Sequence, residues 1–443
     1  MATFSRWLIA PVLLCLTAHA AAADDVSAAD GPAGDRERTY EDRIEELERT
    51  VGVLATELER TRRESVVPES PDLKSKYGMG PSASKVFDLS RGLSLGGYGE
   101  INYTGFVGDK GSNLNKTDAL RGVLYVGYKF SESIVFNSEI EIEHADEIFL
   151  EFAELNFMWK EWANAKAGLL LLPMGFLNEI HEPPFFFGVN RPDVERQIIP
   201  STWRENGVGF FGGYSDLVHY KLYAVNGLDA SGFGASGIRG GRQKGSKALA
   251  EHFAVVGRID ITPTPETLFG ASFYYGGSGQ NQKLSNTDEL LPDVSFPDAE
   301  TTVFDLHAQY KAHGLHLRGL FTMAFVDDAG DLTRARMATD EDFEGAIAKQ
   351  MLGGYAEIAY DIWPWLASTE RSFEPFYRYE YYDTQHEMPS SFSADRSKEI
   401  QSHTVGFNFK PITNVVLKLD YRNRDPKDGT IADEINVGVG YVF

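Results

Sequence analysis

The chain of 443 residues contains a single cysteine, Cys15, and it lacks any run of the roughly 20 apolar residues that a membrane-spanning helix needs. Its longest apolar stretch, residues 7–18, is followed by small residues, which predicts a cleaved signal peptide over residues 1–23. The alternative is an uncleaved anchor. Cleavage would leave a chain without thiols, and this excludes disulfides and cysteine-ligated metal sites.

Positive charge is also scarce. There are 42 Lys and Arg residues against 65 Asp and Glu, and the formal net charge is -23. A chain this acidic repels the phosphates of nucleic acids, so we expect no nucleic-acid partner. Acidic loops that face outward are instead expected to bind the divalent cations that bridge lipopolysaccharide. We expect no metal or cofactor site, because Asp327, Asp328 and Asp331 lack EF-hand spacing and His181-Glu182 is too short for a zinc motif.

The chain changes character several times before any strand pattern begins. Residues 24–39 are rich in Ala, Asp and Gly, which is typical of a disordered acidic segment. Residues 40–65 carry the heptad seam of a short coiled coil, with seam positions at Tyr40, Ile44, Leu47, Val51, Leu54, Leu58 and Thr61. We expect this coiled coil to lie in the periplasm and to self-associate, the alternative being one amphipathic helix on its own barrel. Residues 66–92, with three prolines, predict a linker.

From residue 93 onward, apolar and polar positions alternate in segments that are separated by turn residues. In residues 435–443 every odd position is apolar or aromatic, which is the period of a strand with two different faces. We predict strands at 93–107, 117–130, 133–145, 148–160, 164–174, 202–214, 217–228, 248–262, 267–277, 300–311, 315–327, 350–363, 372–384, 400–410, 414–424 and 434–443. About sixteen strands, an even number, predict an all-β fold, a transmembrane antiparallel up-and-down β-barrel over residues 93–443.

The connections between the predicted strands support the same fold. Those after even-numbered strands are short, and those after odd-numbered strands are mostly long, notably 175–201, 229–247, 278–299, 328–349 and 385–399. Short periplasmic turns and long external loops are typical of an outer-membrane barrel, whereas a soluble sandwich has no reason to sort its loops. Trp159, Trp162, Trp363 and Trp365 flank two of the short turns, where interfacial aromatic residues are expected.

Alternation also sorts the charged side chains onto one face of the wall. In residues 139–143, Glu at odd positions alternates with Ile at even positions, and because charges facing lipid are costly, the glutamates are predicted to face a water-filled lumen. The same parity places in the lumen Glu100, Arg121, Lys166, Lys221, Arg258, Asp260, Asp305, Arg318, Glu357, Arg378, Glu380, Lys418, Asp420 and Arg422. These charges either line a solute channel or only solvate the interior, and the pattern leaves both interpretations open.

The long connection 175–201 is the best candidate for a pore constriction. Residues 183–187 read Pro-Pro-Phe-Phe-Phe, so the connection is stiff and has apolar surface to pack against a wall. Folded inward, it would bring Arg191, Arg196 and Arg204 close to passing solute, and guanidinium groups suit phosphate or carboxylate. The alternative is an outward loop on a neighbouring subunit. Our candidate constriction and solute-binding residues are Arg191, Arg196, Arg204, Arg258, Arg318, Arg378, Lys418, Arg422, Glu139, Glu141 and Glu143.

A family resemblance is visible in this region. Residues 183–192, Pro-Pro-Phe-Phe-Phe-Gly-Val-Asn-Arg-Pro, and residues 202–209, Thr-Trp-Arg-Glu-Asn-Gly-Val-Gly, resemble the phosphate-selective porin O/P family. The resemblance covers 93–443, including the terminal Phe443, and implies a trimeric channel of about sixteen strands whose third external loop folds into the pore. It also implies that an N-terminal coiled coil can precede the barrel. The ladder of lumen arginines and the lysine cluster behind phosphate selectivity in that family have no match here.

We therefore expect an outer-membrane porin, a homotrimer among outer-membrane lipids, that lets small hydrophilic solutes diffuse passively and favours small anions such as phosphate. A basic loop tip at 239–244 would attract anions to its mouth. The first alternative is a structural barrel that tethers the membrane through its coiled coil. The second is an outer-membrane hydrolase, but we expect no enzyme, because the G-x-S-x-G match around Ser94 opens a predicted strand and lacks a strand-turn-helix context.

Overall fold

The computed structural model describes residues 43–53, 74–286, 289–369 and 371–443. The chain divides into two units, Met1–Arg62 and Arg63–Phe443. The predicted signal peptide (1–23) and acidic segment (24–39) lie outside the described residues. In the first unit, residues 43–53 of the predicted coiled coil are helical, and the seam residues Ile44, Leu47 and Val51 are exposed. Self-association through this seam stays a prediction.

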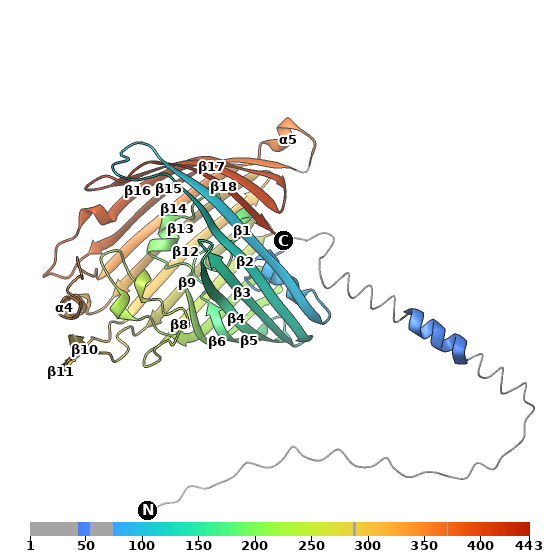
Figure 1. Cartoon of the computed structure of the whole chain (residues 1–443), viewed down its shortest axis with the longest axis horizontal. Helices are drawn as coiled ribbons and strands as arrows, with labels where there is room; N and C mark the ends of the chain where they lie inside the picture. The colour runs from blue at the N-terminus through green and yellow to red at the C-terminus, as the bar shows by residue number, and fades with distance from the viewer. Residues whose placement is uncertain (1–42, 54–73, 287–288, 370) are drawn as a thin grey trace, which may run out of the picture. The chain divides into compact units, whose positions relative to one another are not determined.

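Sixteen antiparallel strands of the second unit close into a barrel within the described residues, which confirms the predicted fold (Figure 1). They are β1 (Gly92–Phe106), β2 (Lys116–Ser131), β3 (Ile134–Glu143), β4 (Glu147–Lys160), β5 (Ala163–Leu171), β6 (Arg204–Tyr214), β7 (Val218–Asn226), β8 (Phe253–Thr264), β9 (Thr267–Gly276), β12 (Thr301–Ala312), β13 (Leu315–Val326), β14 (Gln350–Tyr360), β15 (Ser372–Glu387), β16 (Glu399–Ile412), β17 (Val415–Pro426) and β18 (Glu434–Val442). Each strand pairs with its neighbours along the chain, and pairing of β1 with β18 closes the wall.

The connections carry small elements that the sequence pattern did not predict. The connection 278–299 holds a separate two-stranded sheet of β10 (Lys283–Asn286) and β11 (Glu289–Ser295), and 328–349 holds helix α4 (Ala329–Thr339). The other helices and 3-10 turns are short: α2 (Pro81–Ser84), η1 (Lys85–Phe87), η2 (Pro183–Phe185), α3 (Asp193–Gln197), η3 (Ser215–Leu217), η4 (Ala230–Gly232), η5 (Arg239–Gly241), α5 (Trp363–Leu366) and η6 (Arg396–Lys398).

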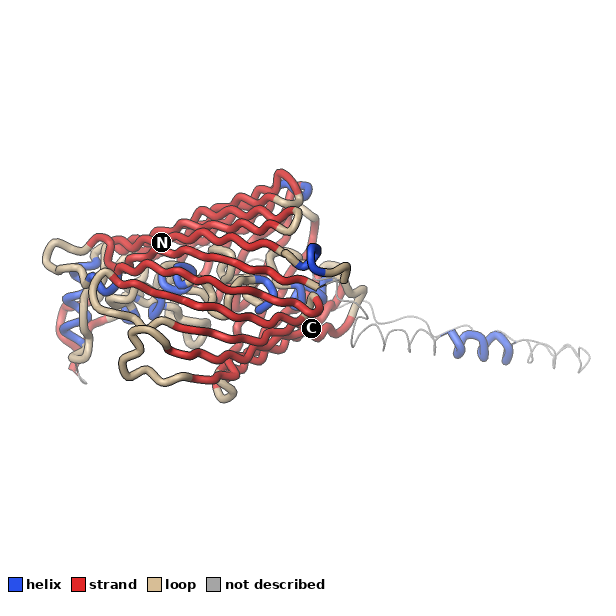
Figure 2. Tube along the Cα trace, turned by 90° about the horizontal axis from the view of Figure 1, so that it is seen from above, coloured by secondary structure: helices blue, strands red, loops and turns tan. Residues whose placement is uncertain are grey.

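Long and short connections lie at opposite ends of the barrel (Figure 2). In Figure 1, α4, β10 and β11 mark the long-loop end, and α5 and the C-terminus mark the short-turn end. None of the described helices has both the length and the apolar character needed to cross a bilayer.

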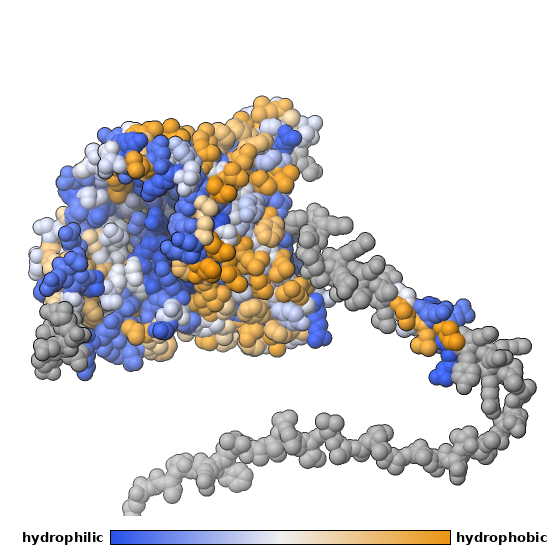
Figure 3. All heavy atoms as spheres, in the orientation of Figure 1, coloured by the Kyte–Doolittle hydropathy of each residue, from blue (hydrophilic) through white to orange (hydrophobic). Residues whose placement is uncertain are grey.

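The two faces of the wall differ as the alternation predicts. Ile140 and Ile142 are 37% and 42% exposed on the outside, whereas Glu139 and Glu141 are 1% and 3% exposed and face inward. Figure 3 shows a broad hydrophobic area over the strands, with hydrophilic residues gathered toward the long-loop end. Because water cannot stabilise so much exposed apolar area, this outer wall suits contact with hydrocarbon.

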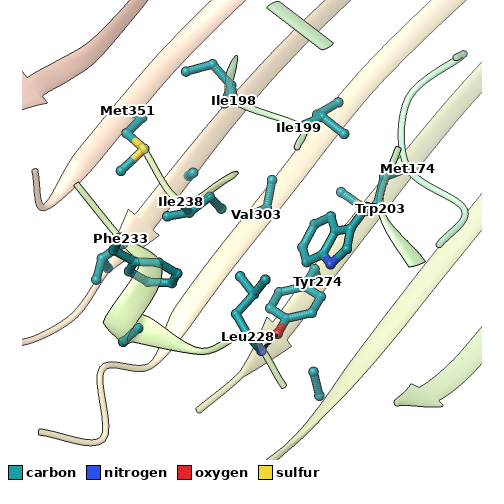
Figure 4. Packing of buried hydrophobic residues seen from close by; sticks show 14 of the residues in the cluster. Met174, Ile198, Ile199, Trp203, Leu228, Phe233, Ile238, Tyr274, Val303 and Met351 are labelled. Carbon is teal, nitrogen blue, oxygen red and sulfur yellow. Dashed lines mark hydrogen bonds between the residues drawn. The ribbon is translucent and has the colours of Figure 1, made fainter. Parts of the chain in front are cut away.

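Part of the interior is filled by a packed apolar cluster rather than by water (Figure 4). The connections at 172–203 and 228–238 fold inward and pack against inward-facing residues of β7 to β14. Trp203 and Tyr274 lie with ring centroids 4.6 Å apart, and Leu228 donates its backbone N–H to the Tyr274 hydroxyl over 2.9 Å. Toward the long-loop end these strands therefore carry apolar residues on their inner face.

Residues 79–86, in the second half of the predicted linker, are largely buried inside the barrel. Ala83 and its neighbours in α2 are buried against Tyr98, Val123 and other inward-facing residues of β1 and β2. Asn137 donates to the carbonyl of Ala83 over 2.9 Å, and Ser82 donates to the carbonyl of Phe443. These contacts make the segment part of the inner wall.

Candidate functional site in the lumen

The connection between β5 and β6, here called the lumen loop (172–203), crosses the barrel interior. Its backbone N–H groups donate to the far wall, from Val189 to Asp420 of β17 over 2.6 Å and from Val194 to Glu380 of β15 over 3.2 Å. Strand β15 is eight positions from β5 around the barrel, so the loop reaches the opposite side. The loop therefore folds inward, and the alternative of an outward loop does not apply.

The turn that directs the loop inward depends on Gly175. This residue has φ +62°, a left-handed conformation that glycine adopts without strain. A Cβ on it would also press on the carboxylate of Glu195, which accepts hydrogen bonds from the N–H groups of Phe176 and Leu177 over 2.9 and 2.8 Å. Tyr355 of β14 donates to the same carboxylate over 2.7 Å. Glu195 thus links the turn at residues 175–177 to β14 of the wall.

Three of the predicted solute-binding residues hold this loop in place. Arg378, with no exposed surface, donates to the carbonyls of Phe187 and Asn190, both over 3.1 Å. Lys418 donates to the carbonyls of Gly188 and Phe186 over 2.8 and 3.1 Å, and Arg422 lies 3.3 Å from the carboxylate of Asp193. Because their donors are engaged by the loop, the role that the structure gives them is anchoring. Solute contact by these three stays a prediction.

The predicted acidic residues form a partly enclosed patch on β3. Arg121 of β2 lies 2.8 Å from Glu100, 3.4 Å from Glu141 and 3.7 Å from Glu143, so one guanidinium balances several carboxylates. Glu139 lies behind them, where Tyr98 donates to it over 3.3 Å. The single positive charge of Arg121 thus offsets part of the acidic charge of this patch.

Arg191, Arg196 and Arg204 lie near a second basic segment, in the β7–β8 connection. The sequence pattern did not predict that the two segments are close together. Arg239 and Arg242 of the β7–β8 connection donate to loop carbonyls, Arg239 to Arg196 over 3.4 Å and Arg242 to Thr202 over 2.9 Å. Burial and the neighbouring guanidinium groups of Arg242, Arg196 and Arg191 lower the pKa of Arg239 to about 9. The cluster therefore remains cationic at neutral pH, with its charges close enough to repel one another.

These basic side chains differ in access. Arg196 is exposed and Arg191 is half-buried, and neither is in an ion pair among the residues that the structure describes. Arg204 is buried, 3.5 Å from Glu151, with its guanidinium 5.9 Å from the ring centroid of Phe149. Arg191 and Arg196 are thus available to solute, and Arg204 is not.

A cavity of about 870 Å³, here called the inner cavity, lies on the short-turn side of the lumen loop. Arg258 and Arg318 both face it, as the parity of β8 and β13 predicts. Its cationic lining is Lys76, Lys221, Arg258, Lys311, Arg318 and Lys410, against the carboxylates of Glu161, Glu179 and Asp260. Lys311 and Lys410 were not among the predicted site residues, although both occupy inward positions in the strand alternation.

A second cavity of about 820 Å³, here called the mouth cavity, is lined by the long connections. Arg239, Arg242, Lys244 and Lys398 face it, against Glu344 and Asp395. Both cavities therefore carry more cations than carboxylates, although the whole chain is strongly acidic.

The serine of the hydrolase-like pattern has no catalytic setting. Ser94 lies within β1, two residues after its start at Gly92, and the strand continues to Phe106. A nucleophile elbow needs a sharp turn from strand to helix at the serine, and this segment has none.

Seating of the lumen loop depends on a glycine in the last strand. Gly440 faces inward on β18, and a Cβ on it would overlap the Cβ of Pro183. We expect Gly440→Ala to lower the free energy of unfolding in detergent by about 1–3 kcal/mol, because overpacking displaces the loop. The matched control is Gly122→Ala on β2, where a Cβ meets nothing within 4 Å. Equal effects of the two substitutions would contradict this seating.

Comparisons with known proteins give one relative and several similar structures. No protein-family model matches the chain. It is 36% identical over 397 residues to an uncharacterized protein of Aquifex aeolicus (strain VF5), across 87% of each chain. The fold is similar to OmpTdeltaL8, a loop deletion mutant of the outer membrane protein OmpT of Vibrio cholerae, with a TM-score of 0.50 and 9% identity over 80% of this chain and 100% of that one. It is similar to the anion-selective porin from Comamonas acidovorans, with a TM-score of 0.50 and 12% identity over the same shares. These structures show the barrel fold.

Proposed function

We propose that this chain, which belongs to one protein family with the uncharacterized Aquifex aeolicus protein, is an outer-membrane channel for passive diffusion of small hydrophilic solutes. The proposal rests first on the closed barrel, whose outer wall is apolar and whose inner wall is charged. A loop that crosses the lumen and is held by buried charges is suited to define a narrow passage between two cavities.

We further propose that the channel favours anions, with phosphate among the candidate solutes. The observation that carries this proposal is the excess of cations over carboxylates in both cavities of a chain whose net charge is -23. A low-dielectric wall focuses the field of its charged groups into the passage, so the local excess matters more than the total charge. The name of the Comamonas acidovorans protein, an anion-selective porin, agrees with this choice.

We also propose an orientation and an assembly for the chain. Residues 75–78 line the inner cavity together with residues of the short turns, Glu161 and Thr413 among them. Short turns face the periplasm in bacterial outer-membrane barrels, which supports a periplasmic position for the predicted coiled coil. The exposed seam of residues 43–53 supports self-association of the chain. Ile44 and Val51 at a with Leu47 at d favour two strands in an isolated coiled coil, so the homotrimer that we propose would be set by the barrels.

Ion selectivity of the purified protein tests the proposal. In planar bilayers with a potassium chloride gradient, we expect discrete conductance steps and a reversal potential that shows anion preference. Substituting phosphate for chloride should preserve the sign of the preference. The absence of conductance would contradict the channel, and cation preference would contradict the anion assignment alone.

A further inference from the structure

We infer that the inner cavity is a binding site for organic anions with an aromatic body, of which benzoate is the simplest probe. The inference deepens the proposed function, since it names a solute class for the same channel and rests on that function. It is carried by a cationic wall and an apolar wall that face one cavity of about 870 Å³, which is within the range of roughly 300–1,000 Å³ typical of small-molecule sites.

The cationic wall lies on β12, β13 and β16, where Lys311, Arg318 and Lys410 face the cavity. Lys410 is paired with Glu374 over 3.0 Å, so the charges left for a solute are those of Lys311 and Arg318. Lys311 makes no ion pair with any residue that the structure describes. Arg318 donates mainly to neutral oxygens, the Gln309 amide over 3.0 Å and the Phe185 carbonyl over 3.3 Å, while its nearest carboxylate oxygen is 4.0 Å away. This wall therefore keeps positive charge for a carboxylate.

The cations on the opposite side of the cavity are already neutralised. Lys221 lies 2.5 Å from Glu179, and Arg258 lies 2.8 Å from Asp260. The positive field in the cavity consequently comes mainly from Lys311 of β12 and Arg318 of β13, so an anion has one preferred place for its charged end.

The apolar wall comes from the lumen loop. Phe176, Ile180 and Phe185 are half-buried and line the cavity, together with Leu268 of β9. Phe186 and Phe187, the next two residues of the Phe run, also line the cavity, but both are buried, and Phe187 stacks on Phe376 with ring centroids 5.6 Å apart. Phe185 is thus the most exposed member of the run at this cavity, and its backbone carbonyl accepts a hydrogen bond from Arg318.

The two walls meet at Arg318, whose guanidinium lies 4.9 Å from the ring centroid of Phe176. A flat arene carboxylate can place its ring against Phe185 and its charge toward Lys311 and Arg318. An inorganic anion gains only the second contact, and it loses hydration beside the apolar wall without compensation. Burial of the ring removes apolar surface from water, which favours an aromatic carboxylate over acetate of the same charge.

The test is block of chloride current by benzoate in planar bilayers that contain the full chain. Benzoate should reduce the current at concentrations about tenfold lower than acetate does, given the buried area of one ring. Phe185→Ala should raise the half-blocking benzoate concentration roughly fivefold through the lost ring contact, and Lys311→Gln roughly threefold through the lost charge. Neither variant should raise the half-blocking concentration of acetate as much as fivefold.

The matched controls are Phe269→Ala, on the outer face of β9, and Lys110→Gln, on an exposed connection. Benzoate should block the current through both variants at the same concentration as in the unaltered protein. Lys311 is exposed and unpaired among the described residues, so its variant folds even if the Phe185 variant does not. If benzoate and acetate block equally well, or if Lys311→Gln leaves the block by benzoate unchanged, the inference is overturned. The proposed function still stands in that case, provided that the current is anion-selective. A protein without any current overturns both.

Discussion

Replacing Arg378 with methionine is expected to lower the free energy of unfolding by about 3–5 kcal/mol and to raise the single-channel conductance. Arg378 is completely buried, and its guanidinium lies 3.1 Å from Glu357 and 2.9 Å from Glu380. Removal of the cation would leave two buried carboxylates without their partner, and this accounts for the stability loss. The loop carbonyls of Phe187 and Asn190 would lose their donors at the same time, so the lumen loop should move away from the wall.

Two further variants separate the anchoring role from a general loss of charge. Arg334→Met removes an exposed arginine of α4 that pairs with Asp331, and it should change the unfolding free energy by less than about 0.5 kcal/mol. Adding Glu357→Gln and Glu380→Gln to Arg378→Met should recover much of the lost stability, because no buried charge is then unpaired. Conductance should stay high in this triple variant, since the loop is still without its anchor. A normal conductance in Arg378→Met would contradict anchoring.

The wall of the barrel could be predicted from the sequence because one local rule governs it. Side chains of a strand alternate between the two faces, and the contrast between apolar outer positions and polar inner positions is written into short segments. Glu139 and Ile140, for example, occupy opposite faces as the pattern predicts. The lengths of the connections predicted which of them lie at each end of the barrel, since short and long connections alternate all around it.

The contents of the barrel could not be predicted in the same way, because they depend on contacts between residues far apart in the chain. Lys418 meets the carbonyl of Gly188, 230 positions earlier, and no periodic signal connects them. Charges that face inward have the same pattern whether they bind solute, as we propose for Lys311, or anchor a loop, as Arg378 does. The juxtaposition of Arg239 and Arg196 likewise depends on two connections folding inward together.

The exposed charges near the mouth should set the sign of ion selectivity. The double variant Arg191→Glu and Arg196→Glu is expected to reverse the reversal potential from anion preference to cation preference. Arg196 lies near Arg239 and Arg242, and Arg191 lies near Arg239, so their substitution exchanges two positive charges for two negative ones in this cluster. Each unit charge at about 8 Å from a solute contributes roughly 0.5 kcal/mol in water. The two substitutions change the charge by four units, so the anion-to-cation permeability ratio should change by roughly tenfold after partial screening by salt.

Salt dependence and a matched control make this test specific to the mouth. The shift should shrink as potassium chloride rises from about 0.1 M to about 1 M, because the Debye length falls from roughly 10 Å to roughly 3 Å. Arg334→Glu with Lys349→Glu makes the same change in net charge on the β13–β14 connection, outside the basic cluster around Arg239 and Arg242, and it should leave the reversal potential nearly unchanged. If the control shifts selectivity as much as the mouth variant, the total charge of the protein governs permeation and the local cluster does not. If neither variant shifts it, selectivity resides beyond the lumen loop, at the cationic wall of the inner cavity.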